Sequence, residues 1–167
     1  MGDSMKLCRL IYKSVATSEV VPNQSLRDIE REAVAANSRA GITGLLMLSG
    51  DVFVQVLEGA SRDVTALFGK ILDDKRHHLV ELISVEPSDE RYFRDWNMRL
   101  LDLYDLPGEK RAVLTAKYQG QDGGIVIPRD VHSIYALLFD ARHLCLSTPW
   151  QAPGDDNPSN LVHSGAA

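Results

Sequence analysis

The sequence contains few of the features that mark extracellular, membrane-bound or nucleic-acid-binding proteins. Its two cysteines, Cys8 and Cys145, are too few for a disulfide framework, and the N-terminus lacks the basic and apolar segments of a secretory signal. No apolar run approaches the roughly 18 residues of a membrane span. The 18 basic and 23 acidic residues give a net charge of −5, which argues against a broad phosphate-binding surface. We therefore expect a cytoplasmic protein that binds neither membranes nor nucleic acid.

The sequence also lacks the short motifs of common enzymes and metal sites. It contains no Gly-x-Gly-x-x-Gly dinucleotide loop, no Walker A phosphate loop and no Gly-x-Ser-x-Gly nucleophile elbow. No spacing of cysteine and histidine suits zinc, and the adjacent His77 and His78 would point apart on a regular element. We expect neither an enzyme nor a metal centre.

What is present is the composition of a globular domain, with 44% hydrophobic and 25% charged residues among 167. Helical periodicity predicts one helix beginning at Ser25 and ending at Gly41, and a second beginning at Ser61, with each serine as a cap. Apolar or alternating segments predict strands over residues 6–13, 42–48, 52–58, 79–86 and 96–101. The order β-α-β-β-α-β-β is ferredoxin-like, so we expect an α+β fold: a five-stranded mixed sheet with both helices on one face.

Two finer features follow from local spacing. Ser49-Gly50-Asp51 is expected to join the second and third strands as a hairpin. In the fifth strand, alternation predicts Trp96, Met98 and Leu100 on one face of the sheet.

The pattern loosens after residue 103. Helices are expected over residues 109–118 and 131–144, the latter capped by Asp130 and rich in apolar residues. Its expected role is to cover the free face of the sheet, and contact with a second copy is the competing role. Residues 149–167, rich in proline, glycine and small polar residues, are typical of a flexible tail. We therefore divide the chain into a domain (5–102), a helical extension (103–148) and a tail (149–167).

Polar residues within apolar patterns are the candidates for function. Asn37 follows Ile29 and Ala33 at helical spacing, which places it on the core-facing side of the first helix. The alternative, which the sequence alone slightly favours, is that Asn37 caps the last turn of this helix. Gln55 alternates with apolar residues of the third strand. A buried amide without partners costs about 1–3 kcal/mol, so Gln55 meets a polar network or a ligand unless its face is exposed. The Tyr12 hydroxyl likewise needs a partner if buried, as it would in an ordinary core.

Charged residues gather near the end of the second helix. Lys70 and Asp74 are four residues apart, which also suits a surface ion pair worth a few tenths of a kcal/mol. Arg76 and His77 follow, where solvated charges near a helix C-terminus are common. Taken together with the three residues above, this group would satisfy a polar heteroaromatic ligand between the two helices.

Five segments, in order over roughly residues 5–102, resemble a BLUF domain: Arg9–Ser14, Asn37–Leu46, Phe53–Gly59, Asp74–His78 and Trp96–Met98. BLUF domains are blue-light sensors that hold FAD noncovalently, and the order of elements expected above is the fold of that family. The resemblance implies a photoreceptor that switches rather than turns over a substrate.

The resemblance also implies a role for each matching residue. Tyr12 would give an electron and a proton to the excited flavin, and the hydrogen bonds of Gln55 would rearrange to give a red-shifted signalling state. Trp96 and Met98 would relay the change outward, and which of the two faces the flavin is left open. The residues implied in cofactor binding are Tyr12, Asn37, Gln55, Lys70, Asp74, Arg76 and His77.

One residue departs from the pattern of the family. Lys70 stands where some BLUF domains carry an arginine near the ribityl phosphate, and lysine keeps the charge without the fork geometry. FMN and riboflavin therefore stay open beside FAD.

The number of residues that follow the sensor domain indicates how its signal would be passed on. Residues 103–167 are too few for a cyclase or phosphodiesterase, so we expect a separate effector protein, and we expect a homo-oligomer. The alternative is a light-independent ligand- or partner-binding module on the same fold. An RNA-binding module shares the β-α-β-β-α-β order, but the charge of −5 and a single third-strand aromatic, Phe53, disfavour it.

Overall fold

A computed structural model gives the structure of the protein and describes residues 6–18 and 23–146. The predicted tail over residues 149–167 lies outside the described residues. The elements are β1 (Leu7–Ala16), α1 (Asn23–Arg39), β2 (Thr43–Ser49), β3 (Val52–Ala60), α2 (Ser61–Leu72), β4 (His77–Ser88), β5 (Asn97–Asp102), α3 (Gly108–Tyr118) and α4 (Val131–Leu146). The predicted order of elements is confirmed, and most elements extend slightly beyond their predicted ends.

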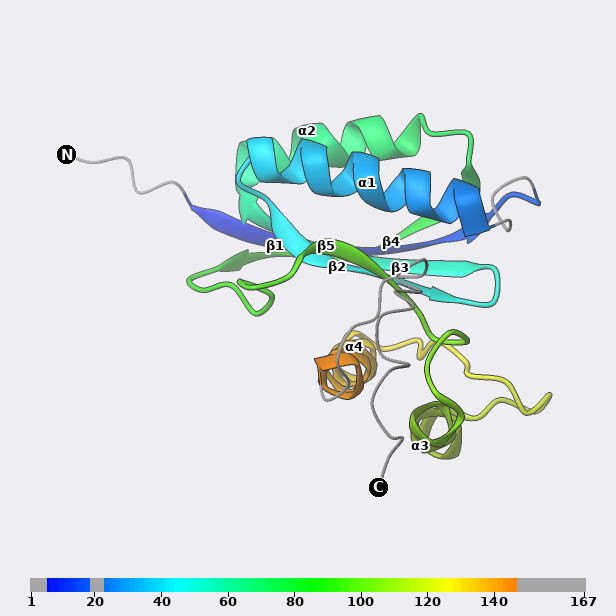
Figure 1. Cartoon of the computed structure of the whole chain (residues 1–167). Coiled ribbons are helices and arrows are strands. Elements are labelled where there is room, and N and C mark those ends of the chain that lie inside the picture. Colours follow the sequence, from blue (N-terminus) through cyan, green and yellow to red (C-terminus); the bar gives the residue numbers. More distant parts are fainter. Residues whose placement is uncertain (1–5, 19–22, 147–167) are drawn as a thin grey trace, which may run out of the picture.

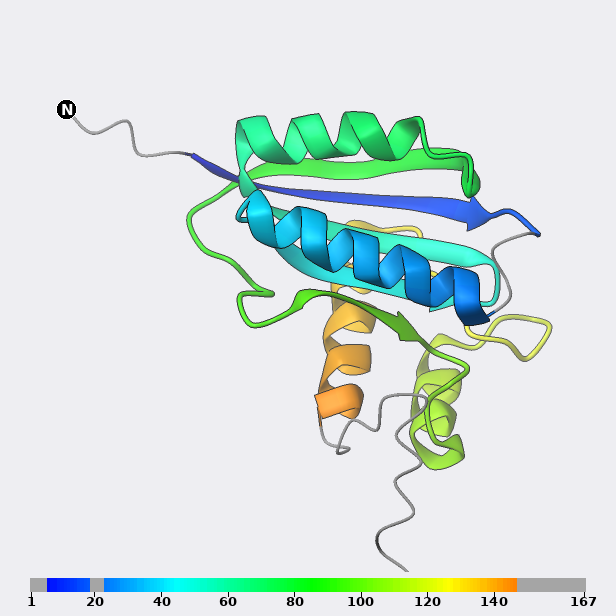
Figure 2. The ribbon, with the colours of Figure 1, turned by 45° about the horizontal axis from the view of Figure 1, so that its top comes forward.

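The sheet has five strands in the order β4-β1-β3-β2-β5. Its pairs are antiparallel except that β5 runs parallel to β2. Helices α1 and α2 lie side by side on one face, and α4 lies on the other side of the sheet with α3 next to it (Figure 1). Figure 2 shows β4 and β5 as the outer strands, β4 beside α2 and β5 beside α1. This is the predicted α+β architecture with a mixed sheet.

Helices cover both faces of the sheet, so the central strands are buried on both sides. Val54 and Val56 of β3 belong to the largest apolar cluster, which also contains Leu137 and Leu138 of α4, whereas Phe53 belongs to a cluster with Leu26 of α1. The expected role of α4 as a cover for the sheet is therefore confirmed. In the described residues, no helix is long and apolar enough to cross a bilayer.

The C-terminal end of α1 is closed by backbone hydrogen bonds. The Ile42 N–H donates to the carbonyl of Asn37 at 2.9 Å, and the Gly41 N–H donates to that of Ser38 at 3.4 Å. Gly41 has φ +63°, which the turn requires and glycine adopts readily. This Schellman motif confirms Gly41 as the terminator and sets the position of Asn37 one turn before it.

The predicted helix starts are only partly correct. Helix α1 begins at Asn23, so Ser25 lies inside the first turn and is not its cap. The residue before α2 is Ala60, and no side chain caps that helix, so the predicted Ser61 cap is also wrong. Asp130 does cap α4, since its Oδ1 accepts the Ser133 N–H at 2.9 Å.

The start of β5 departs from regular alternation. Trp96 packs in the cluster on the α3/α4 side, whereas Met98 is buried with Tyr12 on the α1/α2 side. Met98 has φ +59°, and the register with β2 shifts between Gly44 and Leu46. A left-handed residue breaks the two-residue period of a strand. The prediction that Trp96 and Met98 share a face is therefore wrong.

Candidate functional site

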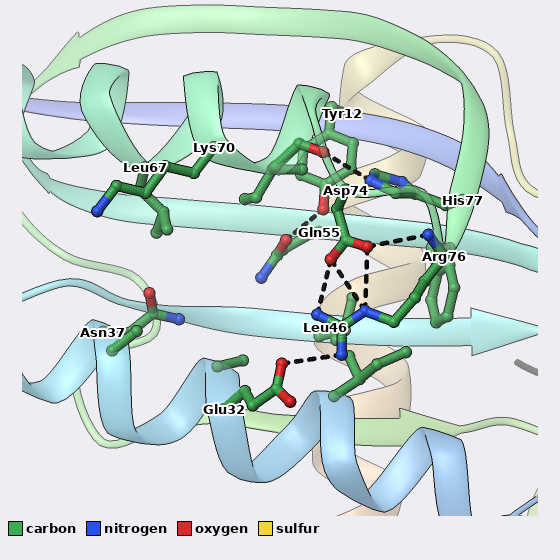
Figure 3. Close-up of a pocket in the computed structure, with 15 residues that line it drawn as sticks. Tyr12, Glu32, Asn37, Leu46, Gln55, Leu67, Lys70, Asp74, Arg76 and His77 are labelled. Carbon is green, nitrogen blue, oxygen red and sulfur yellow. Dashed lines mark hydrogen bonds and ion pairs between the residues drawn. The ribbon is translucent and has the colours of Figure 1, made fainter.

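A cavity opens between α1, α2 and the face of the sheet beneath them (Figure 3). The space between these walls measures about 820 Å³ when the solvent at its open mouth is included. All seven residues predicted to bind a cofactor line it: Tyr12, Asn37, Gln55, Lys70, Asp74, Arg76 and His77. The structure thus brings together side chains that lie up to 65 positions apart in the chain.

Tyr12 and Gln55 lie on the floor of the cavity. They are direct partners across the β1–β3 pair, and each side chain is buried. The Tyr12 hydroxyl donates a hydrogen bond to Gln55 Oε1. Burial, with a smaller contribution from the Asp74 charge, raises the pKa of Tyr12, so its hydroxyl is a donor at neutral pH. The Gln55 amide nitrogen points away from Tyr12 into the space between the helices (Figure 3).

Asn37 carries an unpaired acceptor in the wall of the cavity. Its side chain is 2% exposed, and Oδ1 has no hydrogen-bond partner. The open groups of the last turn of α1 are carbonyls, which only a donor can cap, and the Asn37 amide donates to none of them. The cap that the sequence alone slightly favoured is therefore wrong. A buried acceptor without a donor costs about 1–3 kcal/mol, so this oxygen is a candidate partner for a donor on a bound molecule.

Charged side chains bridge the cavity near its mouth. Asp74 accepts hydrogen bonds from the Arg76 backbone N–H at 2.9 Å and from Arg76 Nη2 at 2.7 Å, and Arg76 Nη1 lies 2.8 Å from Glu32 Oε2. Burial alone would raise the pKa of Asp74, but the hydrogen bonds and charge of Arg76 lower it. Asp74 is therefore ionised at neutral pH. No three His, Cys, Asp or Glu side chains gather as a metal site anywhere in the described parts of the chain.

His77 is already engaged by the protein. Its Nδ1 lies 2.7 Å from Ser14 Oγ, and its Nε2 lies 2.8 Å from the carbonyl oxygen of Ile71. A carbonyl only accepts, so Nε2 carries a proton and donates to it. His77 thus ties β4 to α2 and offers the cavity its ring rather than a free nitrogen. Lys70 lies exposed on the last turn of α2, at the rim.

Several lining residues were missed by sequence reasoning. Glu32 lies three positions after Ile29, a spacing that would place it on the same helical side, but its partner Arg76 is remote in sequence. Ala33 and Ala36 line the cavity with methyl groups only, which leaves room between the helices. Their helical spacing was visible, but the space they leave depends on how α2 packs.

The family of sensors of blue light using FAD matches residues 7–99, more than half of the chain. The chain belongs to the BLUF family. One BLUF relative is the photoactivated adenylate cyclase subunit beta of Euglena gracilis, 36% identical over 99 residues. That match covers 59% of this chain but only 12% of the cyclase subunit, so the two share the sensor region alone.

Solved BLUF structures have the same fold. The BlsA ground state is 26% identical with a TM-score of 0.68, and the match covers 81% of this chain and 87% of BlsA. The BlrB dark state is 28% identical with a TM-score of 0.62, covering 86% and 98%. Klebsiella pneumoniae BlrP1, solved with FMN and cyclic diGMP, is 35% identical with a TM-score of 0.56, covering 62% and 27%.

The residues of the cavity suit a flavin. An isoalloxazine ring has broad apolar faces, and the lining supplies apolar side chains such as Leu46 and Leu67. The pyrimidine edge of the ring carries an N–H between two carbonyls, and the unpaired Asn37 Oδ1 is an acceptor for such a donor. The cation of Lys70 at the rim suits a phosphate.

Proposed function

We propose that this BLUF protein is a blue-light receptor that binds FAD between α1 and α2. The observation that carries the proposal is the buried hydrogen bond between Tyr12 and Gln55, on the floor of a cavity whose wall holds the unpaired Asn37 oxygen. The flavin, when bound, supplies absorption of blue light and an electron acceptor. FAD is preferred because the family is described by it, and FMN is the competing cofactor because BlrP1 was solved with FMN.

The chain would hold the flavin by its edges and faces. Asn37 offers an acceptor, the Gln55 amide nitrogen offers a donor, and Lys70 offers a charge at the rim. Asp74 and Arg76 close one side of the site, because their pair is anchored to α1 through Glu32. His77 shapes the wall next to Tyr12, whose ring centroid lies 6.3 Å from that of His77.

Tyr12 and Gln55 form a pair with two possible arrangements. In the structure the hydroxyl donates to the amide oxygen, and the amide nitrogen faces the cavity. If the amide turns over, Tyr12 meets an N–H donor and its oxygen becomes the acceptor, while the amide oxygen faces the cavity. The two arrangements present opposite hydrogen-bonding groups to the ligand, which is the basis we propose for a switch.

The signal would leave through β5. Met98 packs with Tyr12 on the cavity side of the sheet, and Trp96 packs in the cluster that α4 covers. A displacement of β5 therefore alters packing on both faces. We propose that the chain is not itself an enzyme, that the altered α3/α4 side is presented to a separate effector, and that the protein forms a homo-oligomer.

The proposal is tested with purified protein and added FAD or FMN. The protein should become yellow, and blue light should shift its absorption to the red, with full return in the dark. A protein that takes up neither flavin would favour a light-independent binding module on the same fold.

A further inference from the structure

The outer edge of β5 is held by a side chain of α1. The Leu100 N–H donates to Glu30 Oε1 at 3.1 Å. The opposite edge of β5 pairs with β2. Figure 2 shows β5 running alongside α1 at the outer edge of the sheet. Glu30 therefore accepts a backbone hydrogen bond at the free edge of β5, as the carbonyl of a neighbouring strand would. Its helix, α1, also forms one wall of the cavity.

The hydrogen bond lies where β5 becomes regular. Met98 has a left-handed backbone, and the register with β2 is broken between Gly44 and Leu46. Pairing resumes with Leu46 opposite Leu100, the residue whose amide Glu30 accepts. The Leu100 side chain and Ile29, the neighbour of Glu30 in α1, both pack against the same buried apolar cluster. The irregular segment around Met98 thus ends at a point fixed to α1.

Helix α1 connects this anchor to the cavity. Ile29, Ala33 and Asn37 line the cavity from the same helix that carries Glu30. We propose that Glu30 is a positioning residue that couples α1 to β5, so that a change in the cavity contacts of α1 loosens or tightens the Leu100 amide. This route runs beside the path through Gln55 and Met98, and it rests on the proposed function.

Amide hydrogen exchange at Leu100, followed by NMR on the flavin-loaded full chain in the dark, tests the anchor. Glu30→Ala should speed exchange of the Leu100 amide about tenfold, as expected for one lost hydrogen bond to a carboxylate. Glu30→Gln keeps a carbonyl acceptor and should restore most of the protection. Asp28→Ala is the matched control, because it removes a carboxylate that pairs with Arg31 on the same helix and should leave Leu100 unchanged.

Illumination tests the coupling. In the wild-type protein, blue light should raise the exchange rate of the Leu100 amide towards the rate that Glu30→Ala shows in the dark. In Glu30→Ala, light should change the exchange rate of this amide little. The absorption shift is recorded in the same samples and reports the photoreceptor function separately. Equal Leu100 exchange in the dark for wild type and Glu30→Ala would overturn the anchor. A wild-type protein that shows the red shift without any light-dependent change at Leu100 would overturn the coupling, while absence of the red shift itself would refute the proposed function.

Discussion

Replacing Asn37 by alanine should separate the stability of the protein from its affinity for flavin. Asn37 is 2% exposed and its Oδ1 is unpaired, so the flavin-free fold carries the cost of a buried acceptor. That cost is about 1–3 kcal/mol, and alanine is also the better helix former by roughly 0.5 kcal/mol. Part of the gain is offset by the packing that the amide loses. We therefore expect the free energy of unfolding of the flavin-free protein to rise by about 1 kcal/mol.

The same substitution should weaken flavin binding. Without Oδ1, the ring N–H that Asn37 is proposed to accept is buried without a partner, at a cost of about 1–3 kcal/mol. This corresponds to a rise in Kd of roughly 5- to 150-fold. Stability and affinity should thus change in opposite directions, which simple damage to the fold would not produce.

Urea unfolding of the flavin-free protein and a fluorescence titration with FAD measure the two effects. Ser38→Ala is the matched control, because Ser38 is the exposed neighbour of Asn37 and contributes its backbone to the end of α1. It should leave the Kd unchanged and raise the free energy of unfolding only by the gain in helix propensity of roughly 0.5 kcal/mol. An unchanged Kd for Asn37→Ala would refute the proposed contact, and a clear loss of stability in the flavin-free protein would refute the unpaired acceptor.

Three further substitutions test the scaffold around the site. Gly44→Ala places a Cβ 1.9 Å from the Val56 carbonyl oxygen at φ +153°, so it should cost at least about 2 kcal/mol in urea unfolding, and a neutral effect would contradict the close approach. Glu58→Gln breaks a buried ion pair with Arg9 at 2.8 Å and should cost about 3–5 kcal/mol by thermal unfolding; a loss below 1 kcal/mol would show that the pair is not isolated from water. Asp74→Asn tests the pH dependence of stability. The pKa of Asp74 is lowered in the folded protein, so the ionised carboxylate stabilises the fold. This contribution is fully present above the unfolded-state pKa of about 4 and is lost as the pH falls through the folded-state pKa. The stability difference between wild type and Asp74→Asn should therefore be constant from about pH 5 upward and shrink towards pH 3, and a difference that grows on acidification would contradict the assignment.

The order of the elements was predictable because its signals are local. The helical faces, the hairpin turn around Gly50 and the glycine at the end of α1 each depend on a few neighbouring residues. The cap of α4 by Asp130 is equally local, since its partner Ser133 lies three positions away. Such features need no knowledge of the tertiary structure.

The start of β5 was predicted wrongly because its conformation depends on remote contacts. Met98 reaches the cavity side only through a left-handed backbone, and its Cε lies 2.8 Å from where a Cβ on Gly44 would stand. The prediction from alternating residues holds only for a regular strand, and it therefore placed Trp96 on the same face as Met98. The approach of Met98 to β2 has no counterpart in the local pattern.

The candidate site was predictable in its residues and less so in their partners. Asn37 at the core-facing helical position suited both a cap and a cavity wall, and only the position of α2 across the cavity distinguishes the two. Glu32 was missed because the charge it meets, Arg76, lies across the cavity on another element. Glu30 was missed for the same reason, since its partner is a backbone amide of β5.

The light-minus-dark absorption spectrum of Tyr12→Phe, recorded beside that of the wild type, tests the central claim most directly. Phenylalanine keeps the ring of the buried residue and removes only the hydroxyl that donates to Gln55. The wild-type protein should show a reversible red shift of its flavin absorption under blue light, and Tyr12→Phe should bind the flavin with the same colour and show no shift. An unaltered red shift in Tyr12→Phe, or a flavin-loaded wild type without any shift, would contradict the account.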